Sequence, residues 1–100
     1  MTKIIHKEPL NLTTVSGSAS GNTNKLLVGL LRQILAKPAT LTTVYDITIT
    51  SPESLIIFEA TGCVGNYGIE VALPIRGIHT VTISNATVDE AFTIGLNVEE

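Results

Sequence analysis

The sequence has few of the residues on which most protein chemistry depends. Its 100 residues include one cysteine, no tryptophan, two tyrosines, two phenylalanines and two histidines. The single cysteine, Cys63, excludes a disulfide within the chain. Its glycine and valine neighbours provide no positive charge that would activate the thiol. We therefore expect Cys63 to be a small apolar side chain that is buried or half-buried.

Basic residues are also scarce and scattered. Six Lys and Arg stand against nine Asp and Glu, which gives a net charge of -3, and no aromatic residues lie between the basic ones to stack on bases. Nucleic-acid binding requires a clustered basic stripe. We therefore expect no nucleic-acid partner.

The total charge is low as well. Charged residues make up 15% of the chain, against roughly 25% in a typical soluble domain, and Thr and Ser replace them. Because a small domain has much surface for its volume, few charges predict that part of the surface is covered by self-association or by a larger assembly. No stretch approaches the ~20 apolar residues of a membrane span, and the first ten residues lack a signal-peptide pattern. We expect no membrane partner.

Val, Ile and Thr are abundant and make up 34 of the 100 residues. In segments 45–50, 80–84 and 92–98, apolar residues occupy every second position. Successive side chains of a strand point to opposite faces, so this pattern predicts one buried and one hydroxyl-rich face. The fold class predicted is all-β, a single antiparallel β-sandwich that is jelly-roll-like or Ig-like. The predicted core is formed by the inward positions of these strands: Tyr45, Ile47, Ile49, Ile57, Val71, Leu73, Val81, Ile83, Phe92, Ile94, Leu96 and Val98.

The first quarter of the chain has weaker patterns. We predict a flexible N-terminal arm over residues 1–9, closed by Pro9, and a single sandwich domain over residues 10–100. Residues 10–15 alternate weakly and are a candidate first strand. Residues 16–24 are small and polar, and fit either a flexible loop or a solvated edge strand.

Turn residues divide the second half of the chain. Ser51 and Pro52 begin a turn that predicts a hairpin of two strands. Three glycines in residues 61–68 predict an exposed loop, and Pro74 is expected to end the strand before it. The predicted strands are 42–50, 55–60, 69–73, 78–84 and 91–98.

Residues 25–37 fit two interpretations. Leucine and isoleucine recur at helical spacing, with Asn24 as a possible N-cap and Pro38 just past the end. Gly29 in the middle opposes a helix, and Val28, Leu30 and Ile34 also share a strand face, although Arg32 stands in the same series. We favour a strand, because everything downstream is β.

No arrangement of residues indicates catalysis. His6 and His79 have no metal-type partner at i+2 or i+4, and we expect a solvated or capping role for His79. The pairs Asp89-Glu90 and Glu99-Glu100 lack a calcium-loop pattern, so we expect them to be solvated charges. Asp46 interrupts a strand on its outward face and predicts a cross-strand pair with Lys or Arg. The glycines of residues 61–68 are not followed by the helix start of a phosphate site. We expect a protein that is not an enzyme and has no cofactor or metal.

Three segments of the second half of the chain belong together: residues 38–49, with Pro38-Ala39-Thr40 followed by a Tyr-Asp-Ile-Thr-Ile strand, residues 73–86, with Leu-Pro-Ile-Arg-Gly, and residues 92–100. These segments resemble the small all-β structural proteins encoded among the head and neck genes of tailed bacteriophages. The resemblance covers roughly residues 26–98 and rests on strand and turn residues. It also favours a strand over residues 25–37.

The resemblance implies a virion component, assembled in the host cytoplasm, that decorates the capsid by binding between major capsid subunits. Its partners would be the major capsid protein or other virion proteins, and its own copies in a homo-oligomer, for which we expect a trimer. A tail or neck structural protein is the first alternative, and a carbohydrate- or host-binding sandwich module is the second. The predicted contacts with the partner are the N-terminal arm and the glycine-rich loop: Thr2, Lys3, Ile4, Ile5, His6, Leu10, Leu12, Val64, Asn66 and Tyr67.

Overall fold

The chain folds into β-strands joined by short connections. The computed structural model describes residues 5–23 and 27–99, and only the backbone of Ile5, His6 and Leu27. Within these ranges it contains no helix that could cross a membrane. The eight strands are β1 (Ile5–Thr13), β2 (Ala19–Asn22), β3 (Leu27–Pro38), β4 (Val44–Thr50), β5 (Ile56–Val64), β6 (Tyr67–Gly77), β7 (Thr80–Ser84) and β8 (Ala91–Glu99). The all-β prediction is confirmed.

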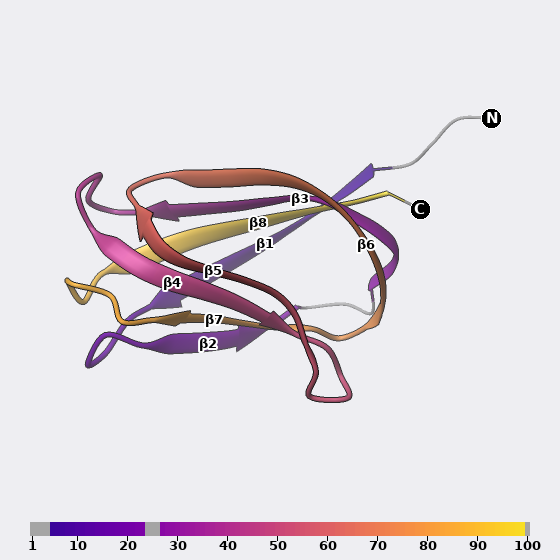
Figure 1. Ribbon diagram of the computed structural model, residues 1–100, viewed down its shortest axis with the longest axis horizontal. Helices are drawn as coiled ribbons and strands as arrows, with labels where there is room; N and C mark the ends of the chain where they lie inside the picture. The colour runs from indigo at the N-terminus through magenta and orange to yellow at the C-terminus, as the bar shows by residue number, and fades with distance from the viewer. Residues whose placement is uncertain (1–4, 24–26, 100) are drawn as a thin grey trace.

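The strands form two four-stranded sheets in the orders β1-β8-β3-β6 and β2-β7-β4-β5. All neighbours are antiparallel. The first strand pairs with the eighth, the second with the seventh, the third with the sixth and the fourth with the fifth. The chain is therefore one long hairpin wrapped into two packed sheets, which is the arrangement of a jelly roll (Figure 1). Of the two sandwich types expected, the topology is the jelly roll.

The core lies between the two sheets and is built from alternate positions of their strands. Of the twelve residues predicted for it, nine are buried, and Ile57, Val71 and Leu73 are half-buried. The rings of Tyr45 and Phe92 meet edge to face, with centroids 5.0 Å apart, a favoured arrangement for aromatic pairs. Buried apolar residues that the pattern did not predict for the core are Leu10, Leu12, Leu31, Ile34, Ala36 and Ile75, and Cys63 is buried as expected.

The segment with helical spacing is a strand, as predicted. β3 lies between β8 and β6, and its register with both neighbours shifts between Leu31 and Gln33. A β-bulge adds one residue to a strand, so the side chains on either side of it no longer alternate simply. Leu31 and Ile34, three residues apart, therefore both face the core. This bulge is the reason that a strand has apolar residues at helical spacing.

The prediction of a loose arm over residues 1–9 is wrong from Ile5 onward. Ile5 already pairs with Glu99, and the pairing with β8 continues without a break to Thr13. Pro9 does not interrupt it, because β1 is an edge strand and a proline is tolerated there. Residues 1–4 lie outside the described residues. Of the two interpretations of residues 16–24, the edge strand holds, since β2 pairs with β7 alone.

The glycine-rich segment 61–68 is not a loop. β5 runs to Val64 and β6 begins at Tyr67, so the connection between the sheets consists of two residues only. Gly62 has φ of +65° beside a register shift in β5, and Gly65 has φ of +63° in the turn. The glycines thus serve a bulge and a tight turn. The predicted strand end at Pro74 is also wrong, because β6 is an edge strand and continues to Gly77.

Candidate functional surfaces

The structure separates the residues that were predicted to contact a partner. Thr2, Lys3 and Ile4 lie outside the described residues. The backbones of Ile5 and His6 belong to β1 and pair with β8.

The prediction for Leu10 and Leu12 is wrong. They are 7% and 6% exposed and belong to the core. Because β1 begins at Ile5 and pairs with β8 in this register, its even-numbered residues from Glu8 to Leu12 point inward.

The other predicted contacts lie together at the connection between β5 and β6. Val64 is 60% exposed, Asn66 is exposed and Tyr67 is half-buried. This connection lies at the opposite end of the sandwich from the beginning of β1 (Figure 1). The described start of β1 and the β5–β6 connection therefore do not form one surface.

Four connections meet at that same end of the sandwich, at the left of Figure 1. They are residues 14–18, 39–43, 65–66 and 85–90, and we call this end the loop end. Each joins a strand of one sheet to a strand of the other. The loop end therefore consists of short crossings between the sheets.

The connection 85–90 holds two of the others through hydrogen bonds. The carboxylate of Asp89 accepts hydrogen bonds from the backbone N–H groups of Ser16 and Gly17, at 3.0 and 2.8 Å. The carboxylate of Glu90 accepts from the N–H of Thr40 and the hydroxyl of Thr43, both at 2.9 Å. Asp89 is exposed and Glu90 is half-buried, so both carboxylates keep access to solvent, and both also anchor neighbouring loops.

The hydroxyl of Thr14 adds a further link to this connection. It accepts a hydrogen bond from the N–H of Glu90 at 2.9 Å and lies 3.2 Å from the carbonyl of Val88, to which it donates. Thr14 is 1% exposed. Among the described residues, no buried side-chain nitrogen or oxygen lacks a hydrogen-bond partner.

The β5–β6 turn is held by Tyr45 of β4 and by Thr43, the residue before that strand. The hydroxyl of Tyr45 donates to the carbonyl of Gly65 at 2.7 Å, and the N–H of Gly65 donates to the carbonyl of Thr43. Burial raises the pKa of Tyr45 well above its ordinary value, and the nearby Cys63 thiol and Tyr67 add to the effect. Tyr45 is therefore a neutral hydrogen-bond donor.

Asp46 has a different role from the one expected. Its carboxylate accepts hydrogen bonds from the side-chain amide of Asn85 at 2.7 Å and from the N–H of Gly62 at 2.9 Å. These two bonds hold the pKa of Asp46 below its ordinary value. The predicted Lys or Arg partner is wrong: at this position the partner strand carries a glycine bulge, and its free N–H attracts the carboxylate.

Exposed aliphatic side chains project from the loop end. Each of its four connections, or the strand end beside it, carries one of them. We call these residues the loop-end surface: Val15 (72% exposed), Leu41 (67%), Val64 (60%) and Val88 (47%). Only Val64 was predicted from the sequence. An apolar residue within a polar turn segment is the signal that could have identified Leu41 and Val88.

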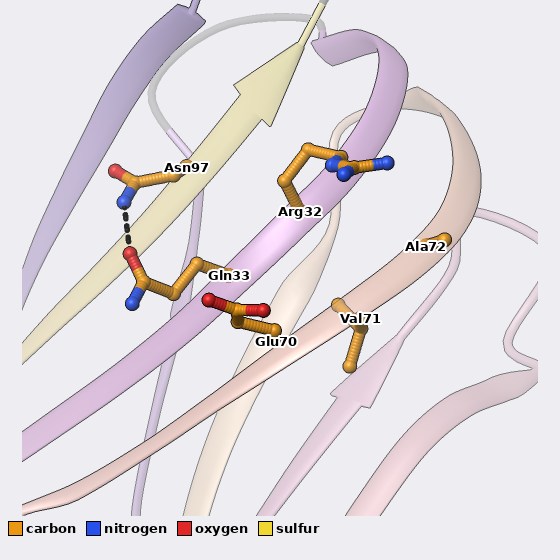
Figure 2. A pocket seen from close by; sticks show the side chains of 6 residues that line it. All are labelled: Arg32, Gln33, Glu70, Val71, Ala72 and Asn97. Carbon is orange, nitrogen blue, oxygen red and sulfur yellow. Dashed lines mark hydrogen bonds between the residues drawn. The ribbon is translucent and has the colours of Figure 1, made fainter.

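A second surface lies on the outer face of the β1-β8-β3-β6 sheet. Asn97 of β8 is the cross-strand partner of Gln33 of β3, which is in turn the partner of Glu70 of β6. Residues opposite each other share a face, and Figure 2 shows the three side chains in a row across the sheet. They line an open hollow of about 510 Å³ together with Arg32, Val71 and Ala72. The sequence alone could not reveal this row, because it depends on strand register.

Comparisons with known proteins give little further information. No protein-family model and no curated protein matches the sequence. Two of the similar solved structures come from bacteria. A family two carbohydrate esterase from Cellvibrio japonicus has a TM-score of 0.47 and 12% identity over 98% of this chain, and the chain spans 34% of that protein. PliG from Aeromonas hydrophila, a periplasmic inhibitor of g-type lysozyme, has a TM-score of 0.47 and 10% identity over 98% of this chain and 86% of its own.

A viral structure is among the similar ones too. A chain of infectious bursal disease virus, Gx strain, has a TM-score of 0.41 and 7% identity over 99% of this chain, which spans 32% of the viral one. Similarity at this level does not indicate a common function.

Proposed function

We propose that this protein is a non-enzymatic structural component of a tailed-phage virion, which decorates the capsid by binding between major capsid subunits. The observation that carries the proposal is the loop-end surface. Four aliphatic side chains that a monomer exposes to water belong to the connections, or to the strand end beside one, that meet at one end of the molecule (Figure 1). Apolar residues gathered on one surface of a soluble domain are typical of an interaction site.

The hydrogen bonds of the loop end make this surface suited to docking. Association costs free energy for every loop and side chain that must be ordered on binding. Here Asp89 and Glu90 already hold the connections that carry Val15 and Leu41, and Tyr45 holds the turn beside Val64. Little ordering is left to occur in the complex, so a small apolar area is enough for useful affinity.

Repetition on a shell multiplies a weak contact. A capsid lattice offers many equivalent sites, and a homo-oligomer binds several of them at once, so that later contacts become intramolecular. We propose a homo-oligomer, with the trimer as the first expectation. The low charge of the chain, 15% of residues, agrees with a molecule that is partly covered in its working state.

The jelly-roll topology and the resemblance of residues 26–98 to phage head and neck proteins both support a virion component. Jelly rolls occur in viral capsids and also in lectins, so the topology alone does not decide the function. The choice between capsid decoration and a neck or tail position is made by the place of binding.

Electron microscopy of heads that lack this protein, incubated with the purified chain, tests the proposal. We expect new density at sites between neighbouring capsid subunits, repeated over the whole lattice. Density confined to a single vertex or to the tail would establish the neck or tail role instead. Heads that gain no density at any position would contradict a virion role.

A further inference from the structure

The hollow on the outer face of the β1-β8-β3-β6 sheet is unrelated to the loop-end surface. Its central feature is the row formed by Asn97, Gln33 and Glu70 on three neighbouring strands. Lys7 of β1 continues the row, since it is the cross-strand partner of Asn97. Opposite side chains of adjacent strands have Cβ atoms about 5 Å apart. The row therefore presents polar groups at regular intervals across the entire sheet.

Two irregularities of register lie beside this row: against β8 the extra residue is in β3, and against β6 it is in β6. Between Leu31 and Gln33 the register shifts against both neighbouring strands, with Arg32 at the shift. Next to Glu70 on β6, the hollow is lined by Ala72 and by the half-buried Val71, which also packs against the core (Figure 2). The volume of the hollow, about 510 Å³, lies in the ~300–1,000 Å³ range of small-ligand sites. Bulges are common next to binding sites, because they redirect side chains.

The row has hydrogen-bonding capacity to spare. The amide of Asn97 donates to the amide oxygen of Gln33 at 2.6 Å. An amide can donate two hydrogen bonds and accept two, so the Gln33 NH₂ group and the Asn97 carbonyl remain available. If both side-chain amides are flipped so that Gln33 donates to Asn97, one NH₂ group and one carbonyl oxygen of the pair still remain available. Within the described residues, Glu70 makes no hydrogen bond or ion pair, so its two oxygens are acceptors for a ligand.

The charges of the residues that line the hollow disfavour an anion; Lys7, beyond Asn97 at the far end of the row, is not one of them. The Nε of Arg32 lies 3.5 Å from a carboxylate oxygen of Glu99, so the guanidinium is already balanced by a negative group. Glu70 is then the uncompensated charge in the lining. A phosphate, sulfate or carboxylate in the hollow would lie near this second carboxylate, and like charges at such distances repel.

We propose that this hollow binds one neutral sugar residue. Sugar hydroxyls both donate and accept hydrogen bonds, which matches a row of a carboxylate, an amide NH₂ and an amide carbonyl. The aliphatic side chains of Val71 and Ala72 offer a surface for the C–H groups of the ring. The hollow is open and contains no aromatic residue, so binding is weak. For a ligand of hexose size we expect a dissociation constant on the order of 1 mM.

The test is a titration of the ¹⁵N-labelled full chain with glucose, galactose, mannose and N-acetylglucosamine, followed by amide chemical shifts. We expect at least one sugar to shift the amides of Gln33, Glu70 and Asn97 in a saturable manner. Glu70→Gln removes a charged acceptor and should weaken that binding about tenfold.

Two comparisons decide how the titration is interpreted. Glu59→Gln is the matched control: Glu59 is an exposed carboxylate of β5, in the other sheet, and its variant should bind the sugar as the native chain does. Galacturonate, an anionic relative of galactose, should bind more weakly than galactose. The proposal is overturned if none of the four sugars gives saturable shifts in the hollow, if the two variants lose affinity equally, or if galacturonate binds more tightly.

Discussion

Asp89 accepts a hydrogen bond from the backbone N–H of Gly17 at 2.8 Å, across 72 positions of sequence. It thereby joins the first connection of the jelly roll to the last. Gly17 has φ of +80° and the preceding Ser16 has φ of +55°, so two successive N–H groups point to one carboxylate. The side chain of one loop fixes the unusual backbone of another, and both loops contribute to the loop-end surface.

Replacing Asp89 with alanine should loosen the turn at Ser16 and Gly17. Two hydrogen bonds to a charged acceptor are lost, but water can reach the exposed N–H groups, so we expect a loss of about 1 kcal/mol in the free energy of unfolding. Asp89→Asn retains an acceptor oxygen and should lose less. Urea denaturation of the three proteins measures the difference. Equal stability of Asp89→Ala and the native chain would show that the turn does not need the carboxylate.

Gly62, within β5, and Gly65, in the turn that follows β5, offer a matched pair of substitutions. Gly62 and Gly65 have φ of +65° and +63°, so alanine at either position costs about 1–2 kcal/mol for the left-handed backbone. A Cβ at Gly62 meets no atom within 4 Å, whereas a Cβ at Gly65 would lie 2.3 Å from the carbonyl oxygen of Leu41. Gly65→Ala should therefore destabilise the protein considerably more than Gly62→Ala. Thermal or urea unfolding checks the order, and equal losses would contradict the close approach of Leu41.

Tyr45→Phe should reduce stability at neutral pH by about 1–2 kcal/mol. The variant keeps the ring contact with Phe92 but leaves the buried carbonyl of Gly65 without its donor. Urea denaturation at pH 7 measures this loss. A stability equal to that of the native chain would show that the hydroxyl does not hold the turn.

The same residue should control part of the stability at high pH. Burial raises the pKa of Tyr45 above the 10.0 of an ordinary tyrosine, so above pH 10 the unfolded chain loses this proton while the folded chain retains it. Stability therefore falls as the pH rises past 10. In Tyr45→Phe this fall should be shallower by at most about 1.4 kcal/mol per pH unit. Parallel curves for the two proteins would contradict the burial of an un-ionised Tyr45.

At low pH, Asp46 and Glu90 should dominate the loss of stability. Burial acts to raise the pKa of Glu90, but hydrogen bonds from Thr40, Thr43 and the N–H of Ala39 together hold it below its ordinary value, and Asp46 is lowered by Asn85 and Gly62. As the pH falls past their ordinary values of 4.5 and 3.8, the unfolded chain takes up protons before the folded chain does. The stability present above this range is then lost until the folded groups are protonated too.

Glu90→Gln tests this account of acid sensitivity. The variant cannot lose a proton at this position, so its free energy of unfolding should fall less steeply between pH 5 and the acid limit than that of the native chain. Glu59→Gln, which changes an exposed carboxylate of β5, is the control for the loss of a carboxylate as such. Urea denaturation across this pH range provides both comparisons.

Much of the sheet structure could be predicted from the sequence, because alternation follows directly from strand geometry. The pattern of β4, β7 and β8 identified Ile47, Ile83 and Ile94 as core residues, and all three are fully buried. The prediction was wrong where a bulge interrupts the alternation, or where an edge strand tolerates a proline. Leu31 and Ile34 have helical spacing because of the bulge between them. Pro74 lies within β6 because that strand is at the edge of its sheet.

The surfaces were less predictable, because they depend on contacts between distant residues. Asp89 and Glu90 appear as two solvated charges in the sequence, and only the folding of four connections to one end reveals their partners. Leu12 was assigned to a partner because the start of β1 could not be located without its register to β8. The row of Asn97, Gln33 and Glu70 needs the register of three strands and the bulge.

Binding of two matched leucine variants to heads that lack the protein tests docking through the loop-end surface. Leu41 and Leu55 are 67% and 64% exposed, in connections at opposite ends of the sandwich. Cosedimentation with heads should show that Leu41→Ser binds at least about tenfold more weakly than the native chain, since the change removes a large apolar side chain from the contact. Leu55→Ser should bind as the native chain does. Native binding by Leu41→Ser, or equal losses for both variants, would contradict docking through the loop end.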